Sequence, residues 1–248
     1  MTKPFEILDR YLERVDAERP GLIEMLYVVG SIALGAWQPG RSDIDTIIVT
    51  SRALDESDLE VVKAAHMGFD GRSLPPGRCT TRSRRRSSTA SSAPVVWLVL
   101  ARHGITVRGP AVAEHGITVD AEALRSYNLD NLRGYWQPLA NQIRKECENV
   151  QDPQSTPVPG EHVAWMMLGP PRLHHTLATG AILSKAGSAG YLREVMPEFA
   201  DLADRAVRWR AGEPQHFTLT DLLACADATD AITEDAHTRF GVYAVRVP

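Results

Sequence analysis

The chain has 248 residues and a mass of 27.3 kDa, which is enough for one large domain or two modest ones. Hydrophobic residues make up 44% of it and charged residues 23%, close to the averages of globular proteins, so the composition excludes wholesale disorder. The formal net charge of −4 gives no general reason for nucleic acid or an anionic membrane to be a partner. No apolar run approaches the ~20 residues that span a bilayer, and the first residues resemble no signal peptide. We therefore expect a cytoplasmic protein with no membrane partner.

The first part of the chain alternates helical and strand-like patterns. Apolar residues recur at helical spacing near the N-terminus, and short runs rich in β-branched residues end at glycine or turn residues. In chain order we predict a helix over 4–18, a strand over 25–29, a short helical stretch over 31–37, a strand over 43–50 and a helix over 54–65. This order favours a small α/β unit built on a sheet.

Residues 71–93 interrupt that pattern with six Arg, six Ser, three Thr and no acidic residue. Leu74 is the single large aliphatic residue among them, so the segment cannot fill a core and predicts a flexible basic loop without a strand. Two other interpretations stay open. The segment could be a basic arm that contacts phosphates, or it could be translated out of frame from GC-rich DNA.

Regular patterning resumes at Pro94 with a predicted helix over 95–103 and a strand over 105–108. The rest of the chain predicts helices over 120–149 with a bend near Pro138, over 161–180 with a break at Pro170-Pro171, and over 185–195, 198–210 and 218–235. We therefore predict the α/β class: a small mixed-sheet domain over residues 1–115, followed by an all-helical domain over residues 116–248.

The residues that suggest chemistry lie between positions 30 and 45. Gly30-Ser31 follows a predicted strand, and Asp43 and Asp45 open the next one. Residues two apart on a strand face the same side, so the two carboxylates should project together. Their mutual repulsion would be offset by a divalent cation, and hard oxygen ligands suit Mg²⁺. A glycine and a serine hydroxyl at a helix start can accommodate a phosphate, so these parts favour phosphoryl or nucleotidyl transfer.

The spacing of this motif resembles that of a known family. Gly30-Ser31, eleven intervening residues and then Asp43-Ile44-Asp45 are similar to the signature of polymerase-β-type nucleotidyltransferases. The stretches 101–110, 128–136 and 172–191 are similar to parts of aminoglycoside adenylyltransferases, of the type that acts on streptomycin and spectinomycin. The resemblance implies ATP as the donor, Mg²⁺ as the cofactor, and transfer of AMP to a hydroxyl group of a small, cationic acceptor.

The resemblance also implies roles for single residues. Asp43 and Asp45 would be catalytic metal ligands, and Gly30 and Ser31 would hold the phosphates of ATP. Most family members add a third carboxylate on the next strand. Asp70 is the carboxylate available there, and its alternative role is that of a turn residue before Gly71. The strand that normally follows this carboxylate in the family is missing from the predicted pattern.

Further candidates lie outside the motif. Arg41 and Ser42 could contact phosphate, and a role on the surface of a turn is the alternative. Lys185 is implied to reach the triphosphate from the helical domain, and the alternative is an exposed lysine. A cationic acceptor requires carboxylates and aromatic faces in its binding site. For a carboxylate the alternative role is a favourable charge in the first turn of a helix, and for a tryptophan it is packing in the core. The candidates for this surface are Glu161, Trp136 and Trp165.

Histidines and cysteines offer no competing site. His174 and His175 are adjacent on a predicted helix and point about 100° apart, which favours packing or surface roles over shared metal ligation. The three cysteines are far apart in the sequence and show no metal-binding spacing.

Three functions from different classes follow. The first is a Mg²⁺-dependent adenylyltransferase for a small molecule, and the second is a nucleotide-binding protein with impaired catalysis, because the third strand looks damaged. The third is a nucleotidyltransferase that modifies a protein or RNA, of the toxin–antitoxin type. The helical C-terminal half favours the first.

Overall fold

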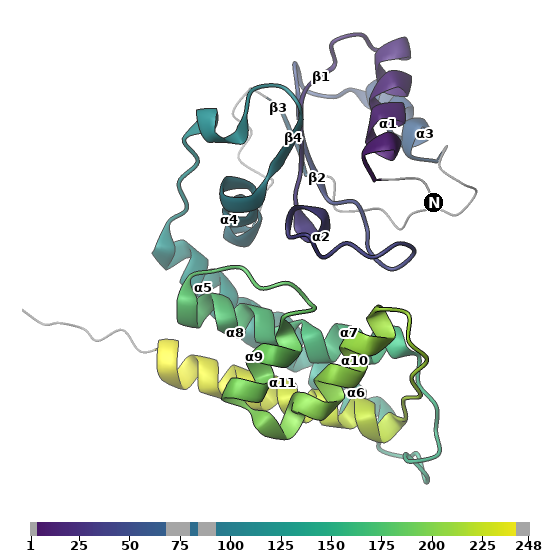
Figure 1. The fold of residues 1–248 in the computed structure, drawn as a ribbon, viewed down its shortest axis with the longest axis vertical. Helices are drawn as coiled ribbons and strands as arrows, with labels where there is room; N and C mark the ends of the chain where they lie inside the picture. The colour runs from purple at the N-terminus through teal and green to yellow at the C-terminus, as the bar shows by residue number, and fades with distance from the viewer. Residues whose placement is uncertain (1–3, 68–79, 84–92, 242–248) are drawn as a thin grey trace, which may run out of the picture. The chain divides into compact units, whose positions relative to one another are not determined.

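The computed structural model describes residues 4–67, 80–83 and 93–241 of the chain. The chain divides into two compact units, Met1–Val119 and Asp120–Pro248 (Figure 1). The first is built on a mixed sheet and the second is mostly helical, which confirms the predicted fold class. Asp120 caps the first helix of the second unit, because its carboxylate accepts hydrogen bonds from the N–H groups of Glu122 and Ala123.

The described residues of the first unit form a four-stranded sheet with the order β3-β2-β1-β4. Strand β1 pairs antiparallel with β2 and with β4, whereas β2 and β3 run parallel. The strands are β1 (Ile23–Val28), β2 (Thr46–Thr50), β3 (Thr80–Ser83) and β4 (Ile105–Arg108).

Strand β2 begins at Thr46, so the predicted strand over 43–50 is wrong at its start. The N–H of Val29 donates to the carbonyl of Asp45 at 2.9 Å, which extends the pairing of β1 and β2 by one residue. Beyond it, Gly30 turns away with a φ of 62° and begins the short helix α2 (Gly30–Ala33), which leaves no partner for the residues before Asp45. Asp43 and Asp45 therefore lie in the segment that leads into the strand, not on it.

Strand β3 lies within the segment that we predict as a loop without a strand, so this expectation is also wrong. Residues Thr80–Ser83 pair parallel with Ile47–Thr50 of β2 at the edge of the sheet. A sheet edge is held by backbone hydrogen bonds, which any non-proline residue can supply, and threonine favours the extended conformation. Residues 71–79 and 84–92 lie outside the described part of the chain.

Helices cover both faces of the sheet. Helices α1 (Pro4–Glu18) and α3 (Glu56–Met67) lie on one side, and α4 (Pro94–His103) lies on the other (Figure 1). The short 3₁₀ helix η1 (Val112–His115) follows β4. One core joins apolar residues of α1, β1, β2 and α3, namely Leu8, Tyr11, Leu12, Val15, Leu22, Ile23, Leu26, Val28, Ile48 and Ala65.

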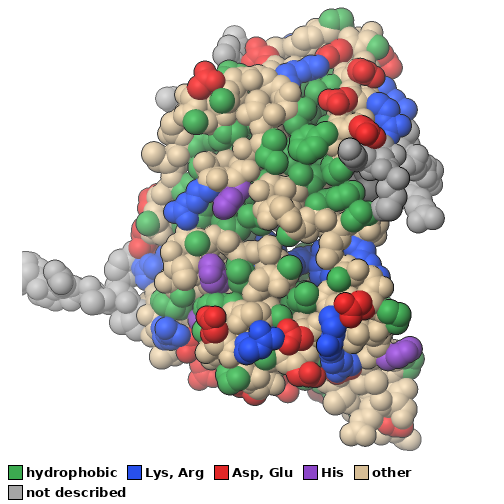
Figure 2. Space-filling view, in the orientation of Figure 1, with side chains coloured by type: hydrophobic (Ala, Val, Ile, Leu, Met, Phe, Trp, Pro, Cys, Tyr) green, Lys and Arg blue, Asp and Glu red, His purple; other side chains and the backbone are tan. Residues whose placement is uncertain are grey.

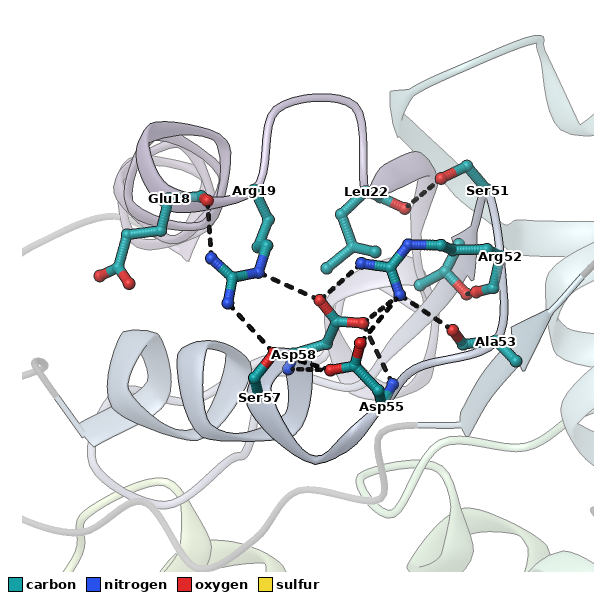
Figure 3. A network of polar contacts seen from close by, with 10 residues as sticks. Glu18, Arg19, Leu22, Ser51, Arg52, Ala53, Asp55, Ser57 and Asp58 are labelled. Atoms are coloured by element: carbon teal, nitrogen blue, oxygen red, sulfur yellow. Dashed lines mark hydrogen bonds and ion pairs between the residues drawn. The ribbon is translucent and has the colours of Figure 1, made fainter.

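A buried carboxylate ties the start of α3 to the end of β2 (Figure 3). The side chain of Asp58 is 0% exposed and lies between the guanidinium groups of Arg52 and Arg19. It also accepts a hydrogen bond from the N–H of Asp55 at 3.1 Å. The hydrogen bonds from Arg52 lower the pKa of Asp58 to about 2, so the carboxylate stays ionised. This network fixes the chain just after β2, the strand that begins directly after Asp45.

The second unit consists of helices joined by short segments. They are α5 (Ala121–Asn131), the π-helical turn η2 (Leu132–Trp136), α6 (Gln137–Cys147), α7 (Gly160–Leu168), α8 (Pro170–Thr179), α9 (Ser188–Val195), the 3₁₀ turn η3 (Pro197–Phe199), α10 (Ala200–Arg210) and α11 (Leu219–Phe240). An isolated bridge between Pro157 and Thr218 joins the segment before α7 to the start of α11.

Two proline positions in this unit coincide with irregular helix geometry, and the predicted break at Pro170 is confirmed. Pro138 has no N–H to donate, and the helix passes it through the π-helical turn, in which the N–H of Gln137 bonds to the carbonyl of Leu132. Pro170 begins α8 after a break at Gly169. A β-carbon on Gly169 would overlap with the Trp136 ring, so glycine is required for the close packing of α7, α8 and η2.

The helical unit has its own core, which includes the fully buried Leu132, Met167, Leu192 and Ile232. On the face shown in Figure 2, acidic and basic side chains are interspersed over this unit. None of the helices in the described part of the chain is long and apolar enough to cross a membrane.

Candidate functional site

Gly30 and Asp45 are in direct contact at the point where β1 and β2 separate. A β-carbon on Gly30 would overlap with the carboxylate of Asp45, and the φ of 62° at Gly30 is one that side chains rarely tolerate. This position therefore requires glycine. The contact brings the two ends of the predicted motif together across the fourteen residues between them.

The hydroxyl of Ser31 lies beside this contact and has no hydrogen-bond partner. Its Oγ is buried, and the structure gives it neither a donor nor an acceptor. Leaving a buried hydroxyl unpaired costs about 1–3 kcal/mol, so such a group is usually satisfied by something that binds there. A phosphate oxygen is a suitable acceptor for it.

Two more buried polar atoms without a hydrogen-bond partner follow in the same segment, and the sequence did not suggest them. They are Nε1 of Trp37 and Oε1 of Gln38. No sequence signal could have found them, because burial of these atoms in a loop is decided by the tertiary structure.

A turn places Arg41 and Ser42 before the carboxylates. The N–H groups of both residues donate to the carbonyl of Gln38, at 3.1 and 2.9 Å, and the Ser42 hydroxyl accepts from the N–H of Gln38 at 3.1 Å. Ser42 thus closes the turn that leads into Asp43, and Arg41 is exposed on its surface. The turn role that we considered for these residues is present, and contact with phosphate stays a prediction.

The carboxylates of Asp43 and Asp45 offer the oxygen ligands that a hard cation prefers. Asp43 is exposed, whereas Asp45 is half-buried against Gly30. Two carboxylates suit Mg²⁺, which keeps several waters and binds substrate phosphates for the rest of its shell. The described residues contain no group of three or more His, Cys, Asp or Glu that could hold a metal ion. Asp70, the predicted third carboxylate, lies outside the described residues.

In the helical unit, three predicted residues gather near the start of α7. Glu161 is exposed in the first turn of the helix, and Trp165 lies one turn later with 46% of its surface exposed. The ammonium group of Lys185 lies 4.8 Å from the centroid of the Trp165 ring, a cation–π contact. Trp165 therefore lies between an exposed acid one turn earlier on its helix and the half-buried Lys185.

Two predictions for this unit require correction. Trp136 is 5% exposed, and its ring packs on Trp165 at 5.5 Å between centroids, so it belongs to the core and not to an exposed ligand surface. The helix predicted from Lys185 begins at Ser188. Ser184 instead accepts the N–H of Gly187 within a preceding turn, and Lys185 lies in that turn.

The adjacent histidines have different environments. His174 is 1% exposed, and its nitrogens contact the Tyr191 hydroxyl at 2.5 Å and the Asp235 carboxylate at 2.6 Å, which confirms its packing role. Burial lowers the pKa of His174, although Asp235 opposes the shift. His175 is half-buried, and its Nδ1 lies 3.2 Å from the carbonyl of Ala181.

Comparison with known proteins agrees with the first unit's geometry. Residues 8–76 match the family described as a nucleotidyltransferase domain, and this range holds Gly30, Ser31, Asp43 and Asp45. No curated protein matches the sequence. The chain carries a nucleotidyltransferase domain, as the sequence predicts.

Most of the chain resembles a solved structure in fold. It is similar to the spectinomycin adenyltransferase AAD(9) from Enterococcus faecialis, whose crystal structure contains ATP and spectinomycin. The TM-score is 0.69 at 13% sequence identity, and the match covers 94% of this chain and 100% of that one. At this identity the likeness concerns the fold.

Proposed function

We propose that the chain transfers AMP from ATP to a hydroxyl group of a small, cationic acceptor of the aminoglycoside or aminocyclitol class, with Mg²⁺ as cofactor. The observation that carries the proposal is the contact of Gly30 with Asp45 beside the unpaired Ser31 hydroxyl. This arrangement joins a place for a phosphate to a carboxylate that can hold a metal, within a nucleotidyltransferase domain.

Each residue of the first unit has a distinct task in this proposal. The absent side chain of Gly30 leaves room for Asp45, and the Ser31 hydroxyl donates to a phosphate oxygen. Asp43 and Asp45 would hold Mg²⁺, which neutralises phosphate charge when bound. Arg41 and Ser42 are proposed to add phosphate contacts, and Lys185 of the helical unit adds a cation for the triphosphate.

The proposed transfer conserves atoms and charge. The acceptor oxygen forms a bond to the α-phosphorus of ATP while the bond from that phosphorus to the bridging oxygen breaks, and pyrophosphate leaves. The hydroxyl proton passes to a carboxylate. Asp70 is the candidate for this base, since proximity makes even modest basicity sufficient.

The acceptor surface is proposed on the helical unit. Glu161 supplies an exposed negative charge, which attracts the ammonium groups of amino sugars, and the partly exposed Trp165 ring lies one turn away. The solved structure of similar fold binds spectinomycin, which makes aminocyclitols the first acceptors to test.

The alternative of a nucleotide-binding protein without catalysis rested on a missing third strand. The structure contains β3, which pairs parallel with β2, so that argument no longer supports the alternative. The Arg-rich segment slightly favours the alternative of a protein or RNA acceptor, whereas the helical second unit favours a small molecule.

Pyrophosphate release from MgATP, with and without spectinomycin or streptomycin, tests the proposal. We expect acceptor-dependent release by the unaltered chain and a loss of at least about 10²–10³-fold in Asp45→Ala. The matched control is Asp9→Ala, which removes an exposed carboxylate from α1 and should leave the rate unchanged. Equal rates in Asp45→Ala and Asp9→Ala would refute the metal assignment, and MgATP binding without release under any acceptor would favour the binding protein.

A further inference from the structure

Three buried polar atoms without a hydrogen-bond partner lie close together along the chain of the first unit. They are Oγ of Ser31, Nε1 of Trp37 and Oε1 of Gln38, and the described residues supply a partner to none of them. Native proteins leave few such groups in a whole domain, because an unpaired buried donor or acceptor is unfavourable. Three of them within residues 31–38 therefore require an explanation.

The backbone brings Trp37 back to Ser31. The N–H of Ala36 donates to the carbonyl of Ser31 at 2.8 Å, so the chain returns to Ser31 directly before Trp37. Gly35, with a φ of 64°, makes this reversal possible. Trp37 thus follows a turn that begins at the residue for which we propose a phosphate contact.

The backbone also ties Gln38 to the turn before the carboxylates. The N–H of Ser42 donates to the carbonyl of Gln38 at 2.9 Å, and the N–H of Gln38 donates to the Ser42 hydroxyl at 3.1 Å. This second turn leads into Asp43. Trp37 and Gln38 therefore join a turn that begins at Ser31 to one that ends before Asp43, and all of these residues belong to one unit.

The two unpaired atoms differ in what they can bind. The indole Nε1 of Trp37 can only donate, whereas Oε1 of Gln38 accepts. Phosphate oxygens are strong acceptors for N–H groups, and the waters that Mg²⁺ retains are donors. A triphosphate with its magnesium ion offers both partners at once.

The backbone around the pair can change locally. Gly35 and Gly40 lie on either side of Trp37 and Gln38, with φ of 64° and 72°, and nothing lies within 4 Å of their β-carbon positions. Glycine changes its backbone conformation at low steric cost. Both side chains are half-buried as a whole, although the two polar atoms are covered. A local rotation can therefore present these atoms to a ligand without disturbing β1 and β2.

We infer that Trp37 and Gln38 are further ligands of MgATP in the first unit. Nε1 of Trp37 donates to a phosphate oxygen, and Oε1 of Gln38 accepts from a water that Mg²⁺ retains. The inference rests on the proposed function, which assigns phosphate to Ser31 and the metal to Asp43. Because both atoms are unpaired beforehand, binding breaks no hydrogen bond that they make to the described residues.

The indole N–H signal of Trp37 in the NMR spectrum of the full chain tests the inference directly. The signal is assigned by its absence in Trp37→Phe. Saturating MgATP should move it to lower field, because a hydrogen bond to a phosphate oxygen deshields the proton. Trp136 is the internal control, since its ring is 5% exposed in the core of the helical unit and its signal should stay in place. A Trp37 signal that does not respond would overturn the inference.

The dissociation constant of MgATP, measured by calorimetry without an acceptor, is the second test. Trp37→Phe and Gln38→Met each remove one polar atom and keep an apolar side chain, so each should weaken binding about two- to tenfold, the worth of one hydrogen bond. Without MgATP, the thermal midpoint of Gln38→Met should be no lower than that of the unaltered chain, because the substitution leaves no partner of Oε1 unpaired. The matched control is Gln142→Met, since Gln142 is exposed on α6 and should not affect MgATP binding.

The outcomes separate this inference from the proposed function. If Asp45→Ala weakens MgATP binding while Trp37→Phe and Gln38→Met bind as tightly as the unaltered chain, the inference fails and the proposed function stands. An equal loss in Gln38→Met and Gln142→Met would show a general effect and overturn the role of Gln38. If the unaltered chain does not bind MgATP, both the inference and the proposed function fail.

Discussion

The two units hold their candidate residues by different means. In the α/β unit, the segment between β1 and β2 is fixed by its own backbone, as in the hydrogen bonds from Val29 to Asp45 and from Ser42 to Gln38. In the helical unit, the segment that carries Lys185 is fixed by the side chains of His175, Thr176 and Ser188. The first arrangement rests on main-chain groups, whereas the second rests on side chains.

This difference explains which site could be recognised in the sequence. A backbone turn with a positive φ demands glycine at a set spacing, so Gly30-Ser31 and Asp43-Ile44-Asp45 form a recognisable pattern. Side-chain anchors make no such demand, because several residue types can donate to a carbonyl. The three predictions below test this comparison, from the largest effect to the smallest.

Replacing Gly30 should disable the α/β site. In Gly30→Ala, the new β-carbon overlaps with the Asp45 carboxylate, and a displacement of about 1 Å at a reacting centre can cost roughly 10²-fold in rate. We expect a loss of at least that size in acceptor-dependent pyrophosphate release. The control is Gly35→Ala, because Gly35 has a similar φ of 64° but nothing within 4 Å of its β-carbon position.

Both variants carry the same backbone strain, so the difference between them isolates the contact with Asp45. Circular dichroism should show both variants folded. Equal activity in the two would mean that the close approach of Gly30 to Asp45 is not needed for the reaction.

Acidification should weaken the helical unit through His174. Its pKa is lowered by burial, so the folded protein holds this proton less tightly than the unfolded chain does. The stabilisation is complete above the unfolded value of 6.5 and is lost as the pH falls below it. We expect the imidazole NMR signals of His174 to stay those of the neutral ring below pH 6.5, and the thermal midpoint to fall over that range.

The variant His174→Gln removes this titration. The difference in free energy of unfolding between the unaltered chain and the variant should therefore shrink as the pH falls. A His174 signal that titrates at or above pH 6.5 would contradict the assignment of a buried neutral ring.

Loss of the acid on α7 should have the smallest effect. Glu161 is exposed, and an exposed ion pair is worth about 0.2–1 kcal/mol, so Glu161→Gln should raise the KM for a cationic acceptor about two- to fivefold. The KM for ATP should not change, and added salt should reduce the difference. Glu213→Gln removes an exposed carboxylate from another part of the unit and serves as the control. The same rise in both variants would indicate a general charge effect.

The sequence by itself determined the fold class, the nucleotidyltransferase motif and most of the helices. Hydrophobic periodicity, proline positions and the spacing of Gly30 from Asp45 are local properties, and the physics that they reflect acts within a few residues or across one strand pair. The break at Pro170 and the passage of the helix around Pro138 were predictable for the same reason.

Only the tertiary structure decided the rest. Strand β3 forms because β2 offers an edge to pair with, although its own residues carry no apolar pattern. Trp136 is buried because Gly169 lets its ring approach, which leaves Trp165 as the exposed aromatic face. His174 reaches Asp235 because α8 and α11 pack side by side. These outcomes depend on which surfaces meet, and the order of residues along one segment does not record that.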